Sequence, residues 1–270
     1  MKLSMWSSYY IDLNPYEMVK ELENIGCKYS ELSDEHGLTL LEESDDVVST
    51  GKKFKEYASL HNVSFLQGHL WLKIKLCSGE DTIEKLKKWI TLFENIGIVT
   101  MVLHCDAMLE DNQLSYKEKL DKNIETLKKL KPFLEGKNIV ICLENLYYIT
   151  KNVDELLYIV NELDSPNFGI CLDTGHLNLT TKNQKEFILK AGKHLKALHI
   201  ADNEGQSDQH LMPFGRGTVN FDEVFSTLKK INYSGLINYE IPGERDCLLE
   251  IRKMKFEYIK NTFDFIINGK

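Results

Sequence analysis

Six short apolar segments of the sequence each end in a side chain that can bind a metal ion. The segments are VSFLQGHL, IVTMVLH, NIVICLE, FGICLD, LKALHI and GLINYE, and the residues concerned are His69, His104, Glu144, Asp173, His199 and Glu240. Each segment is rich in Leu or β-branched residues and is followed by polar or Gly-containing sequence, as expected of a buried strand that enters a loop. If these strands are parallel neighbours in one closed sheet, their C-terminal ends converge. Three His, two Glu and one Asp would then meet at a site that suits a divalent transition metal such as zinc or manganese.

Strands and helices are expected to alternate along the whole chain. The predicted strands are Lys2–Met5, Tyr29–Leu32, Ser64–His69, Val99–His104, Ile139–Glu144, Gly169–Asp173, Ala197–Ile200 and Leu236–Glu240. The predicted helices are Pro15–Ile25, Asp46–His61, Asp81–Ile96, Ser115–Leu134, Val153–Leu163, Lys182–Gly192, Phe221–Ile231 and Leu248–Ile267. Start and stop signals support them: Asn14 is an N-cap candidate, Ser115 and Glu118 form a capping box, and Gly97 follows the third helix.

Eight strand–helix units spaced by roughly 34 residues predict a (β/α)₈ barrel, a TIM barrel formed as one domain over residues 1–270. An open doubly wound sheet is the alternative, but the first strand is not followed by GxGxxG, and no linker or separate domain is evident. Barrel enzymes carry their chemistry at the C-terminal face, where the six side chains would lie.

Composition limits the other classes of function. The chain has 270 residues and a net charge of −8, which disfavours non-specific binding to nucleic acid. No segment approaches the ~20 apolar residues of a membrane span, and the N-terminal segment does not read as a signal peptide. The six cysteines are scattered without a CxxC motif, so we expect reduced thiols in a cytoplasmic protein.

Further potential ligands lie close to the strand ends. His176 comes three residues after Asp173, and Asp208 and His210 follow His199, so five of the eight histidines belong to this constellation. Strand ends are also polar for structural reasons, which is the simpler explanation for any one of these residues. Carboxylates at the end of an apolar run are nevertheless costly to bury unless they are paired or bound to metal. The residue types therefore favour a metal site.

Five motifs resemble the xylose isomerase-like barrel superfamily over the whole chain: LEN, CLDTGH, HIADN, DQHLMPFGRGTVNF and YEI. This superfamily includes sugar-phosphate isomerases and epimerases, ketose 3-epimerases, inosose dehydratases and endonuclease IV. The resemblance to the epimerase branch implies that one divalent metal is held by a quartet, Glu144, Asp173, His199 and Glu240. Zinc or manganese is the expected ion, with cobalt or magnesium as alternatives.

The endonuclease IV branch holds three zinc ions with additional ligands. Each added position has a counterpart of the same type here: His69, His104, His176, Asp208 and His210. The surroundings differ, because that branch has a basic loop for DNA where this chain has the acidic NEGQSDQH. The segment LWLKIKLCSG would supply an apolar wall suited to a compact substrate.

The predicted function is a metal-dependent sugar or sugar-phosphate isomerase or epimerase. Glu144 and Glu240, three strands apart, would take and return a proton at the carbon next to a carbonyl. Arg216, Trp71 and Glu31 are candidates for substrate binding, each with an ordinary structural alternative. An endonuclease IV-like hydrolase of abasic-site DNA and a barrel that binds a ligand without catalysis are the other hypotheses. Nucleic acid and membranes are not expected partners, and the sugar and the oligomeric state stay open.

Overall fold

Eight parallel strands close into a barrel in the order of the chain, which confirms the predicted (β/α)₈ fold and excludes the open sheet. The computed structural model describes residues 1–77, 79, 81–108 and 113–269. The strands are β1 (Lys2–Trp6), β2 (Tyr29–Leu32), β3 (Ser64–His69), β4 (Thr100–Leu103), β5 (Val140–Glu144), β6 (Phe168–Asp173), β7 (Leu195–Ile200) and β8 (Leu236–Tyr239). The pairing of β1 with β8 closes the ring.

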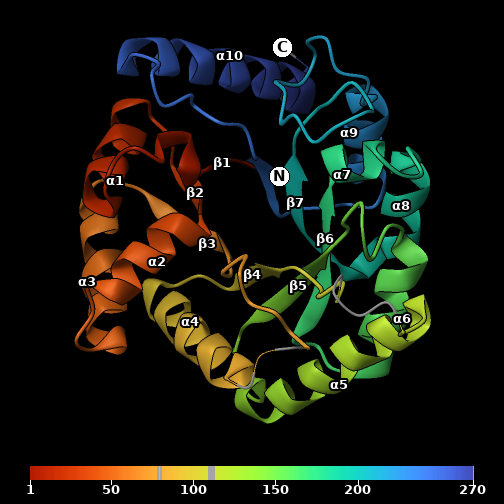
Figure 1. Cartoon of the computed structure of the whole chain (residues 1–270). Helices are drawn as coiled ribbons and strands as arrows, with labels where there is room; N and C mark the ends of the chain where they lie inside the picture. The colour runs from red at the N-terminus through yellow and green to blue at the C-terminus, as the bar shows by residue number, and fades with distance from the viewer. Residues whose placement is uncertain (78, 80, 109–112, 270) are drawn as a thin grey trace.

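Helices surround the barrel on all sides, as the view in Figure 1 shows. They are α1 (Pro15–Asn24), α2 (Asp34–Glu42), α3 (Val47–Leu60), α4 (Thr82–Ile96), α5 (Tyr116–Leu134), α6 (Val153–Leu163), α7 (Thr174–Asn178), α8 (Gln184–Ala191), α9 (Phe221–Lys230) and α10 (Leu249–Asn268), with 3₁₀ turns η1 (Ser7–Tyr10) and η2 (Gly192–His194). The eight predicted helices are all present. Two more, α2 and α7, are short and follow directly on β2 and β6, so they were not distinguished from loop sequence.

Local signals explain where several helices begin. The Asn14 side chain accepts hydrogen bonds from the backbone N–H groups of Tyr16 and Glu17. The backbone N–H of Asn14 in turn donates to the Glu17 carboxylate. Ser115 and Glu118 form the same reciprocal arrangement at α5. Each box satisfies backbone donors that the first turn of a helix leaves unpaired. The local sequence therefore determines where α1 and α5 begin.

The barrel interior is filled by small buried side chains below the ligand residues. Val102, Cys142, Cys171 and Ala197 form a separate apolar cluster, and each is fully buried. Successive side chains of a strand point to opposite faces, so the residue two positions later points the same way. These later residues are His104, Glu144, Asp173 and His199. The pleat of β4 to β7 thus builds an apolar floor and a ligand layer above it.

A partly buried ion pair joins segments near the two ends of the chain. Arg252 of α10 is 1% exposed and donates two hydrogen bonds to the carboxylate of Asp12, at 2.6 and 2.9 Å. The Tyr9 hydroxyl donates to the backbone carbonyl of Arg252 at 2.6 Å. These contacts attach α10 to the β1–α1 segment. Among the described residues, no helix combines the length and apolar character needed to span a bilayer.

Candidate metal centre

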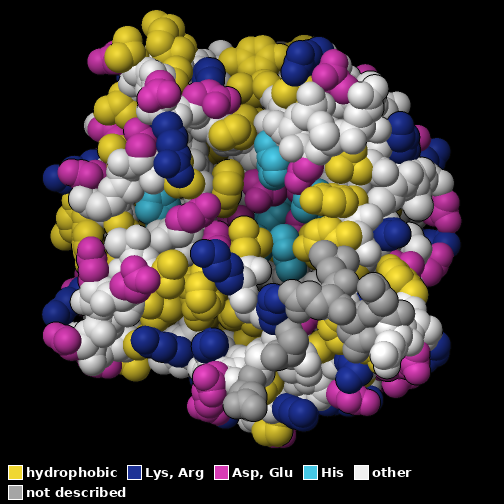
Figure 2. Space-filling model, viewed as in Figure 1, with side chains coloured by type: hydrophobic (Ala, Val, Ile, Leu, Met, Phe, Trp, Pro, Cys, Tyr) yellow, Lys and Arg dark blue, Asp and Glu magenta, His cyan; other side chains and the backbone are white. Residues whose placement is uncertain are grey.

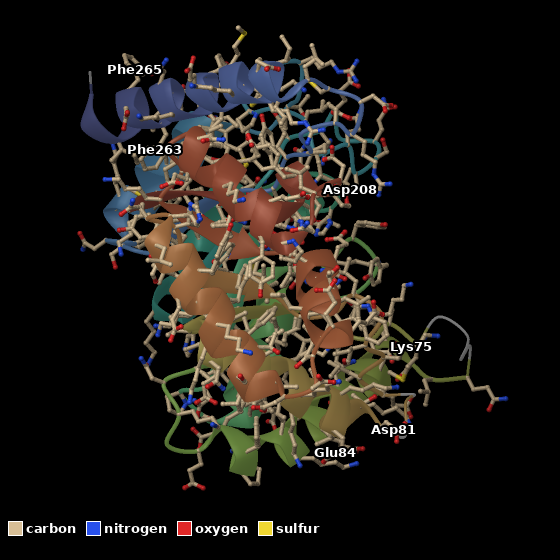
Figure 3. All side chains as sticks on the ribbon, turned by 90° about the vertical axis from the view of Figure 1, so that its left-hand side faces the viewer. Lys75, Asp81, Glu84, Asp208, Phe263 and Phe265 are labelled. Atoms are coloured by element: carbon tan, nitrogen blue, oxygen red, sulfur yellow. The ribbon has the colours of Figure 1, made fainter. Side chains whose placement is uncertain are left out.

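The predicted ligand residues gather in a hollow at the C-terminal ends of the strands. Figure 2 shows His and acidic side chains together at the centre of this face, with hydrophobic side chains around them. Asp208 reaches the site from the loop after β7, and Figure 3 shows it on the side of the barrel that faces the viewer in Figure 1. Nine side chains contribute to the hollow: His69, His104, Glu144, Asp173, His176, His199, Asp208, His210 and Glu240.

Four of these residues form a tight, buried quartet. Glu144 and Asp173 end β5 and β6, His199 lies in β7, and Glu240 directly follows β8. Each offers one donor atom, and the four atoms lie within 4.8 Å of one another. Nδ1 of His199 is 3.2 Å from Oε1 of Glu144 and 3.1 Å from Oε2 of Glu240. One nitrogen and three carboxylate oxygens at this spacing match the ligand chemistry of a divalent transition metal.

Asp173 provides an independent test of whether the quartet fits a cation. It is fully buried, and its Oδ2 atom has no hydrogen-bond partner among the described residues. Its other oxygen accepts a hydrogen bond from the His176 backbone N–H at 2.6 Å, which also caps α7. Burial raises the pKa of Asp173 to about 7, because the charged form loses its hydration. A cation beside Oδ2 would offset that cost, so the residues fit a bound metal.

The two glutamates of the quartet are held in their charged form by neighbouring histidines. Burial opposes ionisation of Glu144, but His199 and His104 outweigh it and hold the pKa of Glu144 well below its usual value. Burial is likewise outweighed at Glu240, where His199 and His210 lower the pKa to about 2. Both carboxylates are therefore ionised at neutral pH and available as ligands or proton acceptors.

Glu144 directs one oxygen into the quartet and the other toward a second group of ligands. Oε2 of Glu144 is 3.0 Å from Nε2 of His104 and 3.5 Å from Nε2 of His69. Donor atoms of these three residues also lie within 4.8 Å of one another. Burial lowers the pKa of His69, but Glu144 outweighs it and raises that pKa to about 9. The geometry allows Glu144 to be shared between two adjacent sites.

A third group closes the hollow on the side of the β7 loop. Oδ2 of Asp208 lies 3.0 Å from Nε2 of His176 and 3.3 Å from Nε2 of His210. Nδ1 of His176 lies 3.0 Å from the Asn145 carbonyl oxygen and 3.2 Å from Oε1 of Glu144. These contacts connect the Asp208 loop to the quartet through His176.

The residues proposed for substrate binding lie in three different settings. Glu31 is fully buried below the hollow, and its Oε2 is 2.9 Å from Nε2 of His199. Trp71 stacks on Trp89 after β3 and is partly exposed. The Arg216 side chain is 68% exposed and lies 3.8 Å from Glu204, which is the setting of a surface ion pair.

Gly217, which follows Arg216, is required by the packing of its own loop. A Cβ atom on Gly217 would lie 2.0 Å from Cγ of Asp202, so no side chain fits at this position. Asp202 in turn accepts hydrogen bonds from the backbone N–H groups of Asn203 and Val219. Asp202 therefore packs directly against Gly217, and this contact helps to fix the loop that carries Asp208.

Two supporting residues and a cavity were not identified from the sequence. Asn145 clamps the end of β6, because its side chain accepts from the Asp173 N–H at 2.8 Å and donates to the Asp173 carbonyl at 3.0 Å. Gln67 lies two positions before His69 on the same face of β3, a spacing that could have revealed it.

A cavity of about 190 Å³ opens beside His104, with an apolar wall that includes Leu72 and Tyr148.

Comparisons with known proteins find both a sugar epimerase and a probable endonuclease among the relatives of this chain. A D-psicose 3-epimerase of Enterocloster bolteae is 26% identical over 210 residues, covering 70% of this chain and 66% of that protein. A probable endonuclease 4 of Ureaplasma parvum is 28% identical over 247 residues, covering 78% and 77%. The crystal structure of a D-tagatose 3-epimerase-like protein superposes with a TM-score of 0.81 at 24% identity, covering 100% of this chain and 99% of that one.

Other relatives match over shorter stretches. The alignments span 52% of a Methanocaldococcus jannaschii protein, MJ1311, at 37% identity and 59% of a Sinorhizobium fredii protein, y4fM, at 29%. The sequence model of the xylose isomerase-like TIM barrel family matches residues 19–264. With the closed barrel and the ligand layer at its C-terminal face, this match shows that the chain belongs to the xylose isomerase-like TIM barrel family.

Proposed function

We propose that this protein is a divalent-metal-dependent isomerase or epimerase that acts on a sugar or a sugar phosphate. The observation that carries the proposal is the buried quartet, in which two ionised glutamates from β5 and β8 meet at Nδ1 of His199. Relatives such as the D-psicose 3-epimerase of Enterocloster bolteae support the same class of reaction. Zinc or manganese is the proposed ion, since one imidazole and three carboxylates suit either.

The reaction requires removal of a proton from a carbon next to a carbonyl group. A divalent ion held by Glu144, Asp173, His199 and Glu240 would polarise that carbonyl and stabilise the negative charge that develops on its oxygen. Glu144 and Glu240 belong to strands three positions apart in the ring, so their carboxylates reach the substrate carbon from different directions. One carboxylate takes the proton, and either the same or the other returns it. Return of the proton to the opposite face of the same carbon gives epimerisation, whereas its return to the former carbonyl carbon gives isomerisation.

The surroundings suit a compact substrate. The cavity of about 190 Å³ beside His104 has apolar walls and a polar edge at His104 and Asp106, which is the character of a small-molecule site. Trp71 is proposed to cover one side of the sugar. Arg216 is proposed to approach a phosphate group only after leaving Glu204.

A second candidate is a phosphodiester hydrolase of the endonuclease IV type. One observation favours it: Glu144 lies between the quartet and the His69–His104 pair, and Asp208 adds a further carboxylate between His176 and His210. Adjacent ligand groups that share a carboxylate suit a cluster of metal ions, which can activate water for phosphodiester hydrolysis. The probable endonuclease 4 of Ureaplasma parvum is among the relatives.

Two assays on the same preparation separate the candidates. Metal-loaded protein is incubated in heavy water with a panel of ketoses and ketose phosphates, and deuterium incorporation next to the carbonyl is measured. We expect incorporation in at least one sugar and its loss in Glu240→Gln, whose amide keeps the shape but is not a base. Glu244→Gln, an exposed position four residues later, is the matched control. Nicking of abasic-site DNA without exchange in any sugar would replace the epimerase with the hydrolase.

The cellular setting is also a proposal. All six cysteines are free thiols, and Cys27, Cys105, Cys142 and Cys171 are buried. Free thiols without structural disulfides are typical of a reducing compartment, in keeping with a cytoplasmic enzyme. The proposed partner is a small-molecule sugar, and the acidic loop around Asp208 disfavours a nucleic acid backbone.

A further inference from the structure

Another buried carboxylate, outside the quartet, lies beneath it. Glu31 and His199 are both fully buried, and Oε2 of Glu31 is 2.9 Å from Nε2 of His199. An irregularity in the β2–β3 pairing places Glu31 opposite Gln67, whose side-chain amide donates to the same oxygen. The Gln67 amide also lies 3.4 Å from the Leu198 carbonyl of β7. Three strands, β2, β3 and β7, therefore hold this group in the barrel interior.

The contact with Glu31 determines which nitrogen of His199 carries a proton. An ionised carboxylate only accepts hydrogen bonds, so the Nε2 atom that faces Glu31 must be the donor. The other nitrogen, Nδ1, faces Oε1 of Glu144 and Oε2 of Glu240. With the Nε2 proton fixed on Glu31, Nδ1 is the atom whose lone pair becomes available to a metal. The ring cannot turn over without losing the contact below it.

A direct role for Glu31 at the substrate does not fit its position. The side chain has no exposed surface, and His199 separates it from Glu144 and Glu240. A purely packing role does not fit either, because Oε1 of Glu31 has no hydrogen-bond partner among the described residues. A buried carboxylate with one unpaired oxygen is costly, and an apolar side chain would fill the space at lower cost. The favourable contact of this charge is the one with His199, assisted by Gln67.

We propose that Glu31 is a positioning residue that fixes His199 in the tautomer with Nδ1 free for the metal, and that Gln67 holds Glu31 in place. The inference rests on the metal site of the proposed function and is independent of which reaction that site catalyses. Outer partners of ligand histidines commonly change metal affinity by about 10- to 100-fold. Glu31 is the Glu of YSEL at the end of β2, a position for which the sequence alone suggests substrate binding.

The test measures metal affinity directly, without substrate. Manganese and zinc dissociation constants are determined for chelator-treated protein by competition with a chromophoric chelator. We expect Glu31→Gln to weaken binding by about 10- to 100-fold, because its amide can present a donor to Nε2 and favour the wrong tautomer. Glu35→Gln is the matched control, since Glu35 is partly buried in the same segment but bonds to Ser8 instead. Its affinity should stay within about twofold of the wild type.

A second readout separates positioning from structural damage. Nitrogen NMR of the His199 ring in zinc-loaded protein should report a protonated Nε2 in the wild type and a changed ring signal in Glu31→Gln. Gln67→Met removes the amide that donates to Glu31 and approaches the Leu198 carbonyl, and it should weaken binding in the same direction by a smaller factor. This variant decides the matter if Glu31→Gln does not fold. Unchanged affinity in folded Glu31→Gln, or in Gln67→Met when that variant decides, overturns the proposal. In that outcome the wild type still binds metal and the proposed function is unaffected.

Discussion

Replacing Asp173 with Asn isolates the contribution of one quartet carboxylate. Asn keeps the Oδ1 acceptor that bonds the His176 backbone N–H at 2.6 Å, but it removes the charge on the buried, unpartnered Oδ2 atom. The folded-state pKa of Asp173 is raised by burial to about 7, above its value of about 3.9 in an unfolded chain. Folding therefore favours the protonated acid, and metal-free stability falls as pH rises from about 4 to about 7. The Asn variant lacks this loss, although it also loses the attraction of Asp173 for His176. At pH 8, metal-free Asp173→Asn should be at least as stable as the wild type.

The response to metal should change in the opposite direction. At a free metal concentration of 100 times the dissociation constant, binding stabilises the folded state by about 2.7 kcal/mol. An unfolding entropy of about 2.1 cal/mol/K per residue gives roughly 0.57 kcal/mol/K for this 270-residue chain, and hence a rise in Tm of about 5 °C. Loss of a direct ligand should cost at least about 100-fold in affinity, as an outer partner already costs about 10- to 100-fold. At the same metal concentration the stabilisation falls to about 0.4 kcal/mol, a shift below about 1 °C.

The assay is thermal unfolding of wild type and Asp173→Asn at pH 8, each after chelator treatment and after addition of manganese or zinc. Elemental analysis of the dialysed proteins measures bound metal independently. Two results would refute the reasoning. An equal metal-induced shift in both proteins would mean that Asp173 is not a ligand. A metal-free variant that unfolds several degrees below the wild type would mean that the carboxylate has a structural role.

Two further predictions concern stability outside the quartet. Arg252→Met removes both hydrogen bonds to Asp12, and we expect the free energy of unfolding in urea to fall by about 2 kcal/mol. The loss is smaller than for a fully buried pair because Asp12 is 32% exposed. An unchanged unfolding midpoint would contradict this prediction. Burial also raises the pKa of Asp34 to about 6, so its charge destabilises the fold increasingly from about pH 4 to pH 6. Asp34→Asn should therefore gain stability relative to the wild type at pH 8 but not at pH 4, and the reverse order would exclude this explanation.

The fold could be predicted because each strand has a recognisable apolar pattern of its own in the sequence. Each of the eight predicted strands overlaps an observed one, since short buried runs between helical patterns leave few alternatives. The helices α2 and α7 were not predicted because their signals are local and weak. The helix α7 has only five residues, and its N-cap is Asp173, a residue that the sequence had already suggested for another role. Asp173 is thus both the N-cap of α7 and a candidate metal ligand, and the hydrophobic periodicity of the sequence cannot show this double role.

The sequence predicts which residues lie together at the candidate site, but it does not predict which of their atoms contact one another. A closed parallel barrel brings all strand ends to one face, so residue type and position sufficed to select Glu144 and His199. Which atom faces which neighbour depends on side-chain rotamers and on pairing irregularities such as the one at Glu31. The sequence therefore left Glu31 as a possible substrate contact, although it lies beneath His199 in the structure. Period-2 alternation on β3 contained a usable signal for Gln67, because it shares the face of His69.

The two oxygens of Glu144 connect the number of bound metals to the reaction. Oε1 faces His199 and Oε2 faces His104 at 3.0 Å, so a metal bound by His69 and His104 would occupy the second oxygen. A carboxylate that coordinates a metal ion through each oxygen is a weaker base, because the two cations withdraw its negative charge. If the protein is an epimerase, deuterium exchange should therefore be highest with one equivalent of metal and should decline as zinc is added in excess. His104→Ala should weaken the second group and relieve this inhibition, with exchange at one equivalent retained. Inhibition by excess zinc that is identical in wild type and His104→Ala would show that Glu144 is not shared between the two groups.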